Sequence, residues 1–390
     1  MKKTFLLQLL LAIAIMTTCY SCEDDEVTPV TTLEIQVTIP DELVEEEKEG
    51  LNVTLSSQST NKTYTGVTDL NGYVQIVVNE GIYNLQVNSN MEYATSYLVG
   101  SIENLSVIGA TQKESVDLMV SIVSNSWVLK ELYFTGSRTP EDKSYYKDKY
   151  FELVNNSDVP LYADGISLCE SDGGTYSDVY EWESIVSLND AFVAGTVYTI
   201  PGDGDDYLIQ PGESVILADL AINHTLENAN SYDLSHADFE WYDEHKLDSD
   251  VPEVPNMIKN FSYSASIWTP HNRGFKSYVI FKAEGSMESF ITNNTIEGQT
   301  ASGIPKFRVK VPNDLILDAV EMSTPTSFTT KVLSSSLDAG WAHCGDEGTE
   351  RYGKCVRRKV EKVVDGRKVY QDTNNSTNDF EATVTPMPGK

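Results

Sequence analysis

Short runs in which apolar and polar residues alternate recur along most of the chain, and they predict β-strands. Successive side chains of a strand point to opposite faces of a sheet, so a period of two is typical of a strand with one buried face. Gly, Asn, Asp or Pro bounds nearly every run, as turns require. The runs are residues 33–39, 52–55, 73–78, 82–87, 150–154, 214–217, 278–281, 307–311 and 315–320.

Helical signals are weak by comparison. The charged segment 41–49 is interpreted as a loop or one helical turn, and 189–192 is too short for a helix. A chain of 390 residues exceeds what one hydrophobic core usually serves, so two or three domains are expected. The sequence therefore predicts an all-β protein with more than one β-sandwich.

A first domain is indicated over residues 33–122. The turn Asp69-Leu70-Asn71-Gly72 precedes strand 73–78, and Glu80-Gly81 precedes strand 82–87. Two hairpins are expected here, because Asn-Gly and Glu-Gly supply the left-handed backbone positions of tight turns. The pattern resembles the carboxypeptidase-regulatory, transthyretin-like sandwich, an Ig-like fold with a Thr-Asp-x-Asn-Gly turn and a Gly-x-Tyr strand. The resemblance implies a noncatalytic support or spacer.

A second domain is indicated over residues 127–390. Residues 127–134 form a predicted strand, 150–162 read as strand, polar turn and strand, and 207–217 read as a hairpin around Pro211-Gly212. The domain resembles a divergent lamin-tail-like sandwich, and the resemblance rests on residues 151–155, 208–217, 315–321 and 372–380. Residues 221–300 depart from that pattern as an insertion rich in Tyr, Trp, His and Asn.

The N-terminus has the layout of a lipoprotein signal. Lys2 and Lys3 precede an apolar stretch that ends at residue 16, and the small residue Ser21 precedes Cys22. We expect a signal peptide over 1–21, lipid attachment at Cys22 and an acidic tether over 22–32. Cys19 is a rival attachment site. The apolar stretch is shorter than the roughly 20 residues of a membrane-spanning helix.

The acidic residues that follow the cysteine have two interpretations. They extend a solvated stalk, or they act as an export signal, since a cysteine followed by an acidic cluster resembles the signal that sends Bacteroidota lipoproteins to the cell surface. The cluster consists of Glu23, Asp24, Asp25 and Glu26. With the two sandwiches behind it, the chain looks like an uncharacterised family of Bacteroidota surface lipoproteins, anchored in outer-membrane lipid and facing the cell exterior.

The charge of the chain excludes one class of partner. Removal of residues 1–21 takes away Lys2 and Lys3 and no acidic residue, so the formal charge changes from 28 minus 59, or −31, to 26 minus 59, or −33. Nucleic-acid binding requires Lys and Arg to neutralise phosphates, so nucleic acid is not an expected partner. The basic stretch of residues 351–368 is interpreted either as a solvated hairpin or as a docking face for an acidic partner.

The remaining cysteines suggest one disulfide. In an oxidising extracytoplasmic compartment, Cys344 and Cys355 are the preferred pair, and Cys169 is expected to be buried and inert. The bridge would close a loop of about ten residues and contribute roughly 2 to 3 kcal/mol.

Aromatic residues of the insertion are the candidate ligand-binding residues. Rings with flanking polar groups recognise sugars, peptides and haem-like ligands, although the same rings are equally suited to core packing. The candidates are Trp241, Tyr242, Tyr263 and Trp268.

Catalytic and metal-binding signals are weaker. The histidines lack the short fixed spacings of zinc ligands, and the carboxylates of residues 202–206 lack the twelve-residue calcium loop, so a solvated turn is preferred there. No Gly-x-Ser-x-Gly elbow or phosphate-binding loop occurs. We therefore expect no catalytic residues, no metal and no cofactor.

Two classes of function remain, and a third fits the architecture. The preferred one is a nonenzymatic surface lipoprotein that captures an unknown ligand or assists a TonB-dependent outer-membrane transporter in nutrient uptake. The alternative is a surface hydrolase with its site in the insertion, for which His236 and His245 are the residues to test. Adhesion through stacked sandwiches is the third.

Overall fold

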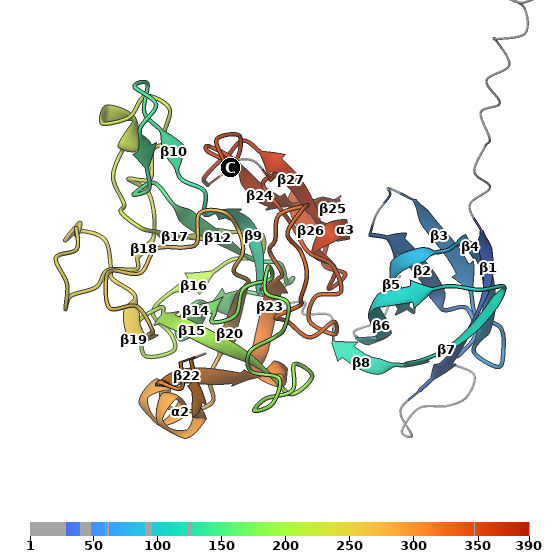
Figure 1. Ribbon diagram of the computed structural model, residues 1–390. Helices are drawn as coiled ribbons and strands as arrows, with labels where there is room; N and C mark the ends of the chain where they lie inside the picture. The colour runs from blue at the N-terminus through green and yellow to red at the C-terminus, as the bar shows by residue number, and fades with distance from the viewer. Residues whose placement is uncertain are drawn as a thin grey trace, which may run out of the picture.

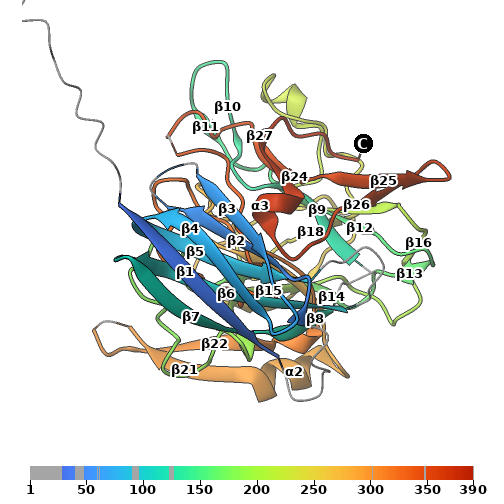
Figure 2. The same ribbon diagram turned by 90° about the vertical axis from the view of Figure 1, so that its right-hand side faces the viewer.

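The computed structural model describes residues 29–39, 48–58, 60, 62–89, 96–122, 127–300, 302–346 and 348–389. These form two units that lie side by side, a smaller one up to residue 122 and a larger one from residue 127 (Figure 1, Figure 2). Strands dominate both units, which confirms the predicted all-β class. Cys22, Cys19 and residues 23–26 lie outside the described residues.

The smaller unit is a sandwich of two sheets. One has the order β3 (Thr63–Val67), β2 (Asn52–Ser57), β5 (Gly81–Asn88), β6 (Ser96–Val107) and β8 (Met119–Ile122), and the other has the order β4 (Tyr73–Asn79), β1 (Val30–Thr38) and β7 (Thr111–Asp117). Leu33, Ile35 and Val37 of β1 alternate with more exposed residues and share one core with Val53 and Leu55 of β2. The period-two pattern of the sequence thus corresponds to one buried face.

The two hairpins predicted in this unit are wrong. β3 pairs with β2, β4 pairs with β1, and β5 pairs with β2 and β6, so the chain changes sheet at both turns. Gly72 has the expected left-handed backbone, with φ of 72°, and the Asp69 carboxylate accepts hydrogen bonds from the backbone N–H groups of Asn71 and Tyr73. Gly81 is not among the residues with positive φ. The residue types that form a turn between two sheets are the same as those that form a hairpin turn, because in both cases they reverse the direction of the chain.

The larger unit contains two large sheets. The first has the order β18 (Phe239–Glu240), β17 (Ser214–Ala218), β12 (Tyr150–Asn155), β9 (Trp127–Tyr133), β24 (Cys355–Arg358) and β27 (Phe380–Val384). The second has the order β21 (Thr295–Gln299), β22 (Pro305–Pro312), β15 (Ala191–Thr199), β14 (Ile166–Ser171), β20 (Tyr278–Lys282) and β23 (Ile316–Val320), and β19 (Ile258–Ser262) pairs with β15.

Smaller elements decorate these sheets. The two-stranded ribbons are β10 (Ser137–Arg138) with β11 (Ser144–Tyr145), β13 (Leu161–Tyr162) with β16 (Leu208–Ile209), and β25 (Val360–Val364) with β26 (Arg367–Tyr370). The helices are α2 (Met287–Asn294), α3 (Ser376–Asp379) and the 3₁₀ turns η2 (His224–Leu226) and η3 (Asn313–Leu315). In the described part of the chain, no helix is long and apolar enough to cross a membrane.

The main core lies between the two large sheets. Leu129 and Phe151 of the first sheet belong to the same buried cluster as Leu168 and Ile280 of the second. The rings of Phe151 and Tyr278 are 4.8 Å apart and join the layers. Burying such side chains stabilises the unit by about 1.5 to 3 kcal/mol each, so this interface is the principal source of its stability.

Several strands of this core are buried on both faces. Every residue of β9, β12, β14 and β15 is buried, including Glu131, Glu152 and Glu170, because residues 221–237 cover the first sheet and α2 helps to cover the second. Lys130 pairs with Glu152 at 2.6 Å under this cover. A strand covered on both sides needs no polar face, so its sequence need not alternate.

The hairpin predicted around Pro211-Gly212 is also a change of sheet. Gly212 has φ of 82° and the N–H of Glu213 donates to the carbonyl of Gln210 at 3.0 Å, so the turn itself is present. β16 before it pairs with β13, however, and β17 after it pairs with β12.

The irregular insertion is shorter in the structure than the range of residues 221–300 that the sequence predicted. β19, β20 and β21 are strands of the second sheet, and β20 lies between β14 and β23. Residues 221–257 hold only η2 and β18, so this shorter stretch is the irregular connection.

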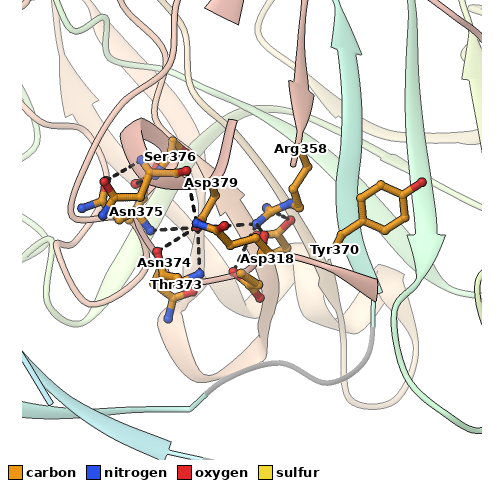
Figure 3. A network of polar contacts seen from close by, with 12 residues as sticks. Asp318, Arg358, Tyr370, Thr373, Asn374, Asn375, Ser376 and Asp379 are labelled. Atoms are coloured by element: carbon orange, nitrogen blue, oxygen red, sulfur yellow. Dashed lines mark hydrogen bonds and ion pairs between the residues drawn. The ribbon is translucent and has the colours of Figure 1, made fainter. Parts of the chain in front are cut away.

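A buried polar network fixes the C-terminal segment. The guanidinium of Arg358, 2% exposed, pairs with Asp318 at 2.5 Å, Asp372 at 3.2 Å and Asp379 at 3.7 Å. Asp379 in turn accepts hydrogen bonds from the backbone and hydroxyl of Thr373. Figure 3 shows Arg358 beside Asp318, with Asp379 between Arg358 and residues 373–376. The network positions the loop that enters α3.

That loop makes the contact between the two units. The amide of Asn375 donates to the side-chain oxygen of Gln86 at 2.9 Å, and the Gln86 amide donates to the carbonyl of Ala339. Open hollows of about 410 and 480 Å³ flank the contact. The first lies between residues 100–102 and 115–117 and residues 188–189 and 331–336, and the second lies between residues 88–89 and 371–378. The units have separate hydrophobic clusters and meet here through polar groups.

Candidate functional site

Two of the four predicted ligand-binding residues belong to the core. Trp241 is 0% and Trp268 is 2% exposed, and their rings lie 5.4 Å apart in an edge-to-face contact. Trp268 also stacks on Tyr198 and donates its indole N–H to Glu170 at 3.2 Å. The binding role predicted for these two tryptophans is therefore wrong, because their rings fill the space between the sheets.

The other two candidates lie nearer the surface. Tyr242 is half-buried, and Tyr263 is 45% exposed with the Arg308 guanidinium 5.2 Å from its ring. Its backbone N–H donates to Gly195 at 2.8 Å, so β15 holds it in place. Partial burial raises the pKa of the Tyr263 hydroxyl to about 12, so it stays neutral.

A buried carboxylate organises the cations beneath Tyr263. Asp172 accepts the Trp182 indole N–H at 2.8 Å, pairs with Lys306 at 3.2 Å, and also pairs with Arg308. Burial alone would raise the pKa of Asp172, but these partners hold it below its usual value. Asp172 therefore remains charged and fixes both cationic side chains.

The loop of residues 269–276 continues this surface. The backbone N–H of His271 donates to the buried Glu170 at 3.1 Å, and the His271 ring lies 5.3 Å from that of Phe275. Phe275 packs at 4.9 Å against Tyr176, which is 55% exposed. Burial raises the pKa of the Glu170 carboxyl. Glu170 thus anchors the loop from below, and the rings of His271 and Phe275 are half-buried.

A pair of tyrosines extends the surface over the first sheet. The hydroxyls of Tyr146 and Tyr352 are 2.8 Å apart, and Asn272 donates to Tyr146 at 3.0 Å. The Arg351 guanidinium lies 4.5 Å and that of Arg138 5.1 Å from the Tyr352 ring. Arg351 also donates to the carbonyl of Asn272 at 2.8 Å, which ties this region to the 269–276 loop.

All these side chains gather at one end of the larger unit. In the first sheet, β9 ends there and its antiparallel neighbours β12 and β24 begin there. In the second sheet, β14 ends there and its antiparallel neighbour β20 begins there. The loops of the two sheets meet where Lys149 donates to the carbonyl of Pro270 at 2.6 Å. We call this surface the cationic aromatic face. It comprises Arg138, Tyr146, Tyr176, Tyr263, His271, Arg273, Phe275, Lys276, Arg308 and Tyr352, with the buried cations Lys149 and Arg351 beneath it.

The face is suited to binding. Loops held by a rigid sandwich commonly carry recognition residues, and here the rings offer apolar surfaces beside fixed positive charges. The sequence predicted only Tyr263 as a binding residue of this face. The others come from segments up to about two hundred residues apart, and no local pattern links them.

His271 makes stability depend on pH. Burial, followed by the charges of Lys276, Lys149, Arg273 and Arg351, lowers its pKa to about 4. The unfolded histidine takes up a proton below about pH 6.5, whereas the folded one stays neutral to about pH 4. Stability should therefore fall between these values as the pH decreases, by about 2 kcal/mol after allowance for partial exposure.

Unfolding of His271→Gln at pH 7.5, 6, 5 and 4 tests this prediction. The variant should lack that part of the acid-dependent loss which belongs to His271, whereas His236→Gln, at an exposed histidine, should keep the wild-type slope. Equal slopes for all three proteins would contradict the assignment.

No metal centre is present in the described ranges, where no group of three or more His, Cys, Asp or Glu side chains could hold an ion. Residues 202–206 form the expected turn, whose backbone N–H groups at Gly204 and Asp206 donate to Asp164. His236 and His245 are both exposed, and His245 pairs with the adjacent Glu244 at 3.6 Å.

The predicted disulfide is absent. Cys344 and Cys355 are free and buried, as is Cys169. The two thiols pack in different clusters, Cys344 between the large sheets and Cys355 with Tyr133 and Tyr150 on the outer side of the first sheet. Burial raises the pKa of all three thiols, so they remain protonated.

The basic stretch of residues 351–368 is divided by the fold. Arg351 and Arg358 are buried, and Arg357 pairs with the buried Glu131. Lys362 and Lys368 are exposed on the ribbon of β25 and β26, which agrees with the interpretation as a solvated hairpin.

Comparison with known proteins identifies one similar family and a few similar structures. No curated protein matches the chain. The profile of a family described as "Protein of unknown function (DUF4876)" matches residues 210–387. The crystal structure of a DUF4876 family protein from Bacteroides thetaiotaomicron VPI-5482 is 25% identical and covers 92% of this chain and 98% of that chain, with a TM-score of 0.59.

Two further structures are too distant to support an argument. A proposed adhesin from Bacteroides ovatus ATCC 8483 has 8% identity and a TM-score of 0.19, covering 74% of this chain and 86% of its own. The shaft pilin SpaA of Lactobacillus rhamnosus GG has 5% identity and a TM-score of 0.16, with 73% and 98% covered. The chain is thus similar to the DUF4876 family, over residues 210–387 in sequence and over nine-tenths of its length in fold, which supports the expected likeness to an uncharacterised family of the Bacteroidota.

Proposed function

We propose that the protein is a nonenzymatic lipoprotein of the outer membrane that captures a ligand at the cell surface. The observation that carries the proposal is the cationic aromatic face, where exposed rings and fixed cations from both sheets gather at one end of the larger unit. Cys22, with the apolar stretch before it and the acidic run after it, supports anchorage facing the cell exterior.

We further propose that the captured ligand passes to an outer-membrane transporter of the TonB-dependent class. The smaller unit lies between the N-terminal segment and the larger unit along the chain, as a spacer would. The hydrolase alternative has less support, because His236 and His245 are exposed and, among the described residues, His245 has only Glu244 as its ion-pair partner. Adhesion remains compatible with the architecture but has no binding residues of its own.

Replacement of the anchor residue tests the location. In Cys22→Ala, incorporation of labelled palmitate should be lost and the protein should no longer sediment with membranes, because a chain without acyl groups has no membrane affinity of this kind. Cys19→Ala is the matched control and should label normally. Labelling that persists in Cys22→Ala, or disappears in Cys19→Ala, contradicts attachment at Cys22.

A pull-down from outer membranes with the full-length chain tests the partner. A co-purifying transporter supports the proposal. Its absence, together with hydrolytic activity that is lost on replacement of His236 or His245, would establish the alternative.

A further inference from the structure

The cationic aromatic face is positive on a strongly negative chain. The whole sequence carries a formal charge of −31, yet Arg138 and Arg351 lie over the ring of Tyr352, and Arg273 directly follows Asn272, which hydrogen-bonds with both Tyr146 and Arg351. The strongest charged influences on Arg351 are tyrosines and the other two arginines. Such a local excess of positive charge attracts anions, although the rest of the molecule is negative and repels them.

The arginines of this region are only weakly neutralised. Arg351, 6% exposed, is held by the neutral carbonyls of Asn272 and Gly348. Arg138 pairs with Asp142 at 2.7 Å, but this carboxylate is 81% exposed and water screens such pairs. Arg273 is exposed, and no ion pair or hydrogen bond of its side chain is found within the described residues. Guanidinium groups held by carbonyls keep their charge for a ligand.

The pKa of the Tyr352 hydroxyl indicates the same preference for negative charge. Burial would raise the pKa of Tyr352, but hydrogen bonds with Ser144 and Tyr146 and the charges of Arg351 and Arg138 lower it below its ordinary value. A position that favours a phenolate oxygen favours other oxyanions, because the same donors and charges act on them.

Rings lie beside these charges. Tyr146 is 37% exposed and its ring centroid lies 6.2 Å from that of Tyr352. Beside the 269–276 loop, the exposed Tyr176 packs against the half-buried Phe275 as a second aromatic pair. Aromatic faces pack against the apolar faces of sugar rings and leave the polar edges free for hydrogen bonds.

We propose that the tyrosine pair and its three arginines bind an acidic saccharide, a sugar ring that carries carboxylate or sulfate groups. The inference rests on the capture function proposed above and names its ligand class. Arg273 and Arg138 pair with the oxyanion, since guanidinium matches carboxylate and sulfate geometry. Tyr146 packs against the ring. The negative charge of the remaining surface disfavours long polyanions such as nucleic acid.

Calorimetry on the purified full-length protein tests the proposal with three probes of equal length. They are tetragalacturonate, a sulfated heparin tetrasaccharide and neutral maltotetraose. At least one acidic probe should bind about tenfold more tightly than maltotetraose, and its affinity should fall as salt is raised. Arg273→Gln should weaken that binding by about tenfold, the effect of losing a charged hydrogen bond.

Lys362→Gln is the matched control, since it removes one exposed cation from the ribbon of β25 and β26. It should bind the acidic probe as the wild type does. Tyr146→Ala should weaken the binding of the acidic saccharides and leave the binding of inorganic sulfate unchanged.

Each contrary result has a separate meaning. Equal affinity for maltotetraose overturns the anionic class and leaves capture intact. Inorganic sulfate that binds as tightly as the sulfated tetrasaccharide overturns the contribution of the ring. Failure of all three probes, while a transporter still co-purifies, overturns the acidic saccharide alone, whereas failure of both experiments removes the capture function as well.

Discussion

Replacement of Arg358 by methionine is expected to lower the free energy of unfolding of the larger unit by about 3 to 5 kcal/mol. The side chain is 2% exposed and faces Asp318, Asp372 and Asp379. Methionine fills a similar volume but leaves these carboxylates without a cation, and the carbonyls of Leu129 and Gln371 without a donor. Breaking a buried pair from one side is costly, since the remaining charge stays out of water.

Denaturant unfolding followed by tryptophan fluorescence measures this effect in the full chain. All five tryptophans lie in the larger unit, so the signal reports that unit alone; they are Trp127, Trp182, Trp241, Trp268 and Trp341. Arg358→Lys should lose less, because it keeps the charge. Lys362→Met, at an exposed cation, should change stability by less than about 0.5 kcal/mol.

The loss in free energy of unfolding caused by Arg358→Met should be smaller at pH 5, where the carboxylates that lack a cation can take up protons. This second measurement also serves if the variant does not fold at pH 7. A loss below about 1 kcal/mol at both pH values would show that the network contributes little.

Truncation of Trp268 should cost the larger unit about 3 to 5 kcal/mol, as expected for a buried tryptophan. Its ring contacts Tyr198 and Trp241, and its N–H is one of three donors to the buried Glu170. Trp268→Phe should fall between the wild type and Trp268→Ala, because it retains an aromatic ring but leaves Glu170 one donor short.

Tyr263→Ala is the informative comparison. This ring is 45% exposed, so its loss should cost less than about 1 kcal/mol and should instead affect binding at the cationic aromatic face. The opposite result, a stable Trp268→Ala that fails to bind and an unstable Tyr263→Ala, would restore the ligand-binding role that the sequence assigned to the tryptophan.

Alternation along the sequence is clearest in strands that have one exposed face. Residues 33–39 and 73–78 alternate because β1 and β4 cover a core on one side and face solvent on the other. β14 and β15, in which every residue is buried, were not predicted, whereas β9 and β12, which are also buried throughout, were predicted. Residues 189–192 were considered as a helical fragment, yet β15 begins at Ala191.

Pairing was harder to predict than strand formation. The turns at Asn71-Gly72 and Pro211-Gly212 are where the residues indicate, but each carries the chain into another sheet. Turn residues specify that the backbone reverses. Which neighbour a strand then joins depends on the whole core, and local sequence does not encode it.

The candidate site was predicted least well. Trp241 and Trp268 were chosen for their aromatic character, and that same character places them in the core. Tyr146, Asn272 and Tyr352 meet only because β9, β12, β20 and β24 have their ends at one edge of the unit. Charged and aromatic residues far apart in sequence give no signal until topology brings them together.

The parallel pairing of β1 with β7 has a mechanical consequence. Tension between the N-terminal segment and the larger unit enters at the start of β1 and leaves through the end of β7 and β8. Because the two strands run in the same direction, this force pulls them along their length in opposite senses. Seven residue pairs, from Thr32 with Thr111 to Thr38 with Asp117, then carry the load together in shear instead of separating one at a time. Under the anchorage proposed for Cys22, a pull on the larger unit therefore loads the pair of β1 and β7 in shear, and its hydrogen bonds share the force.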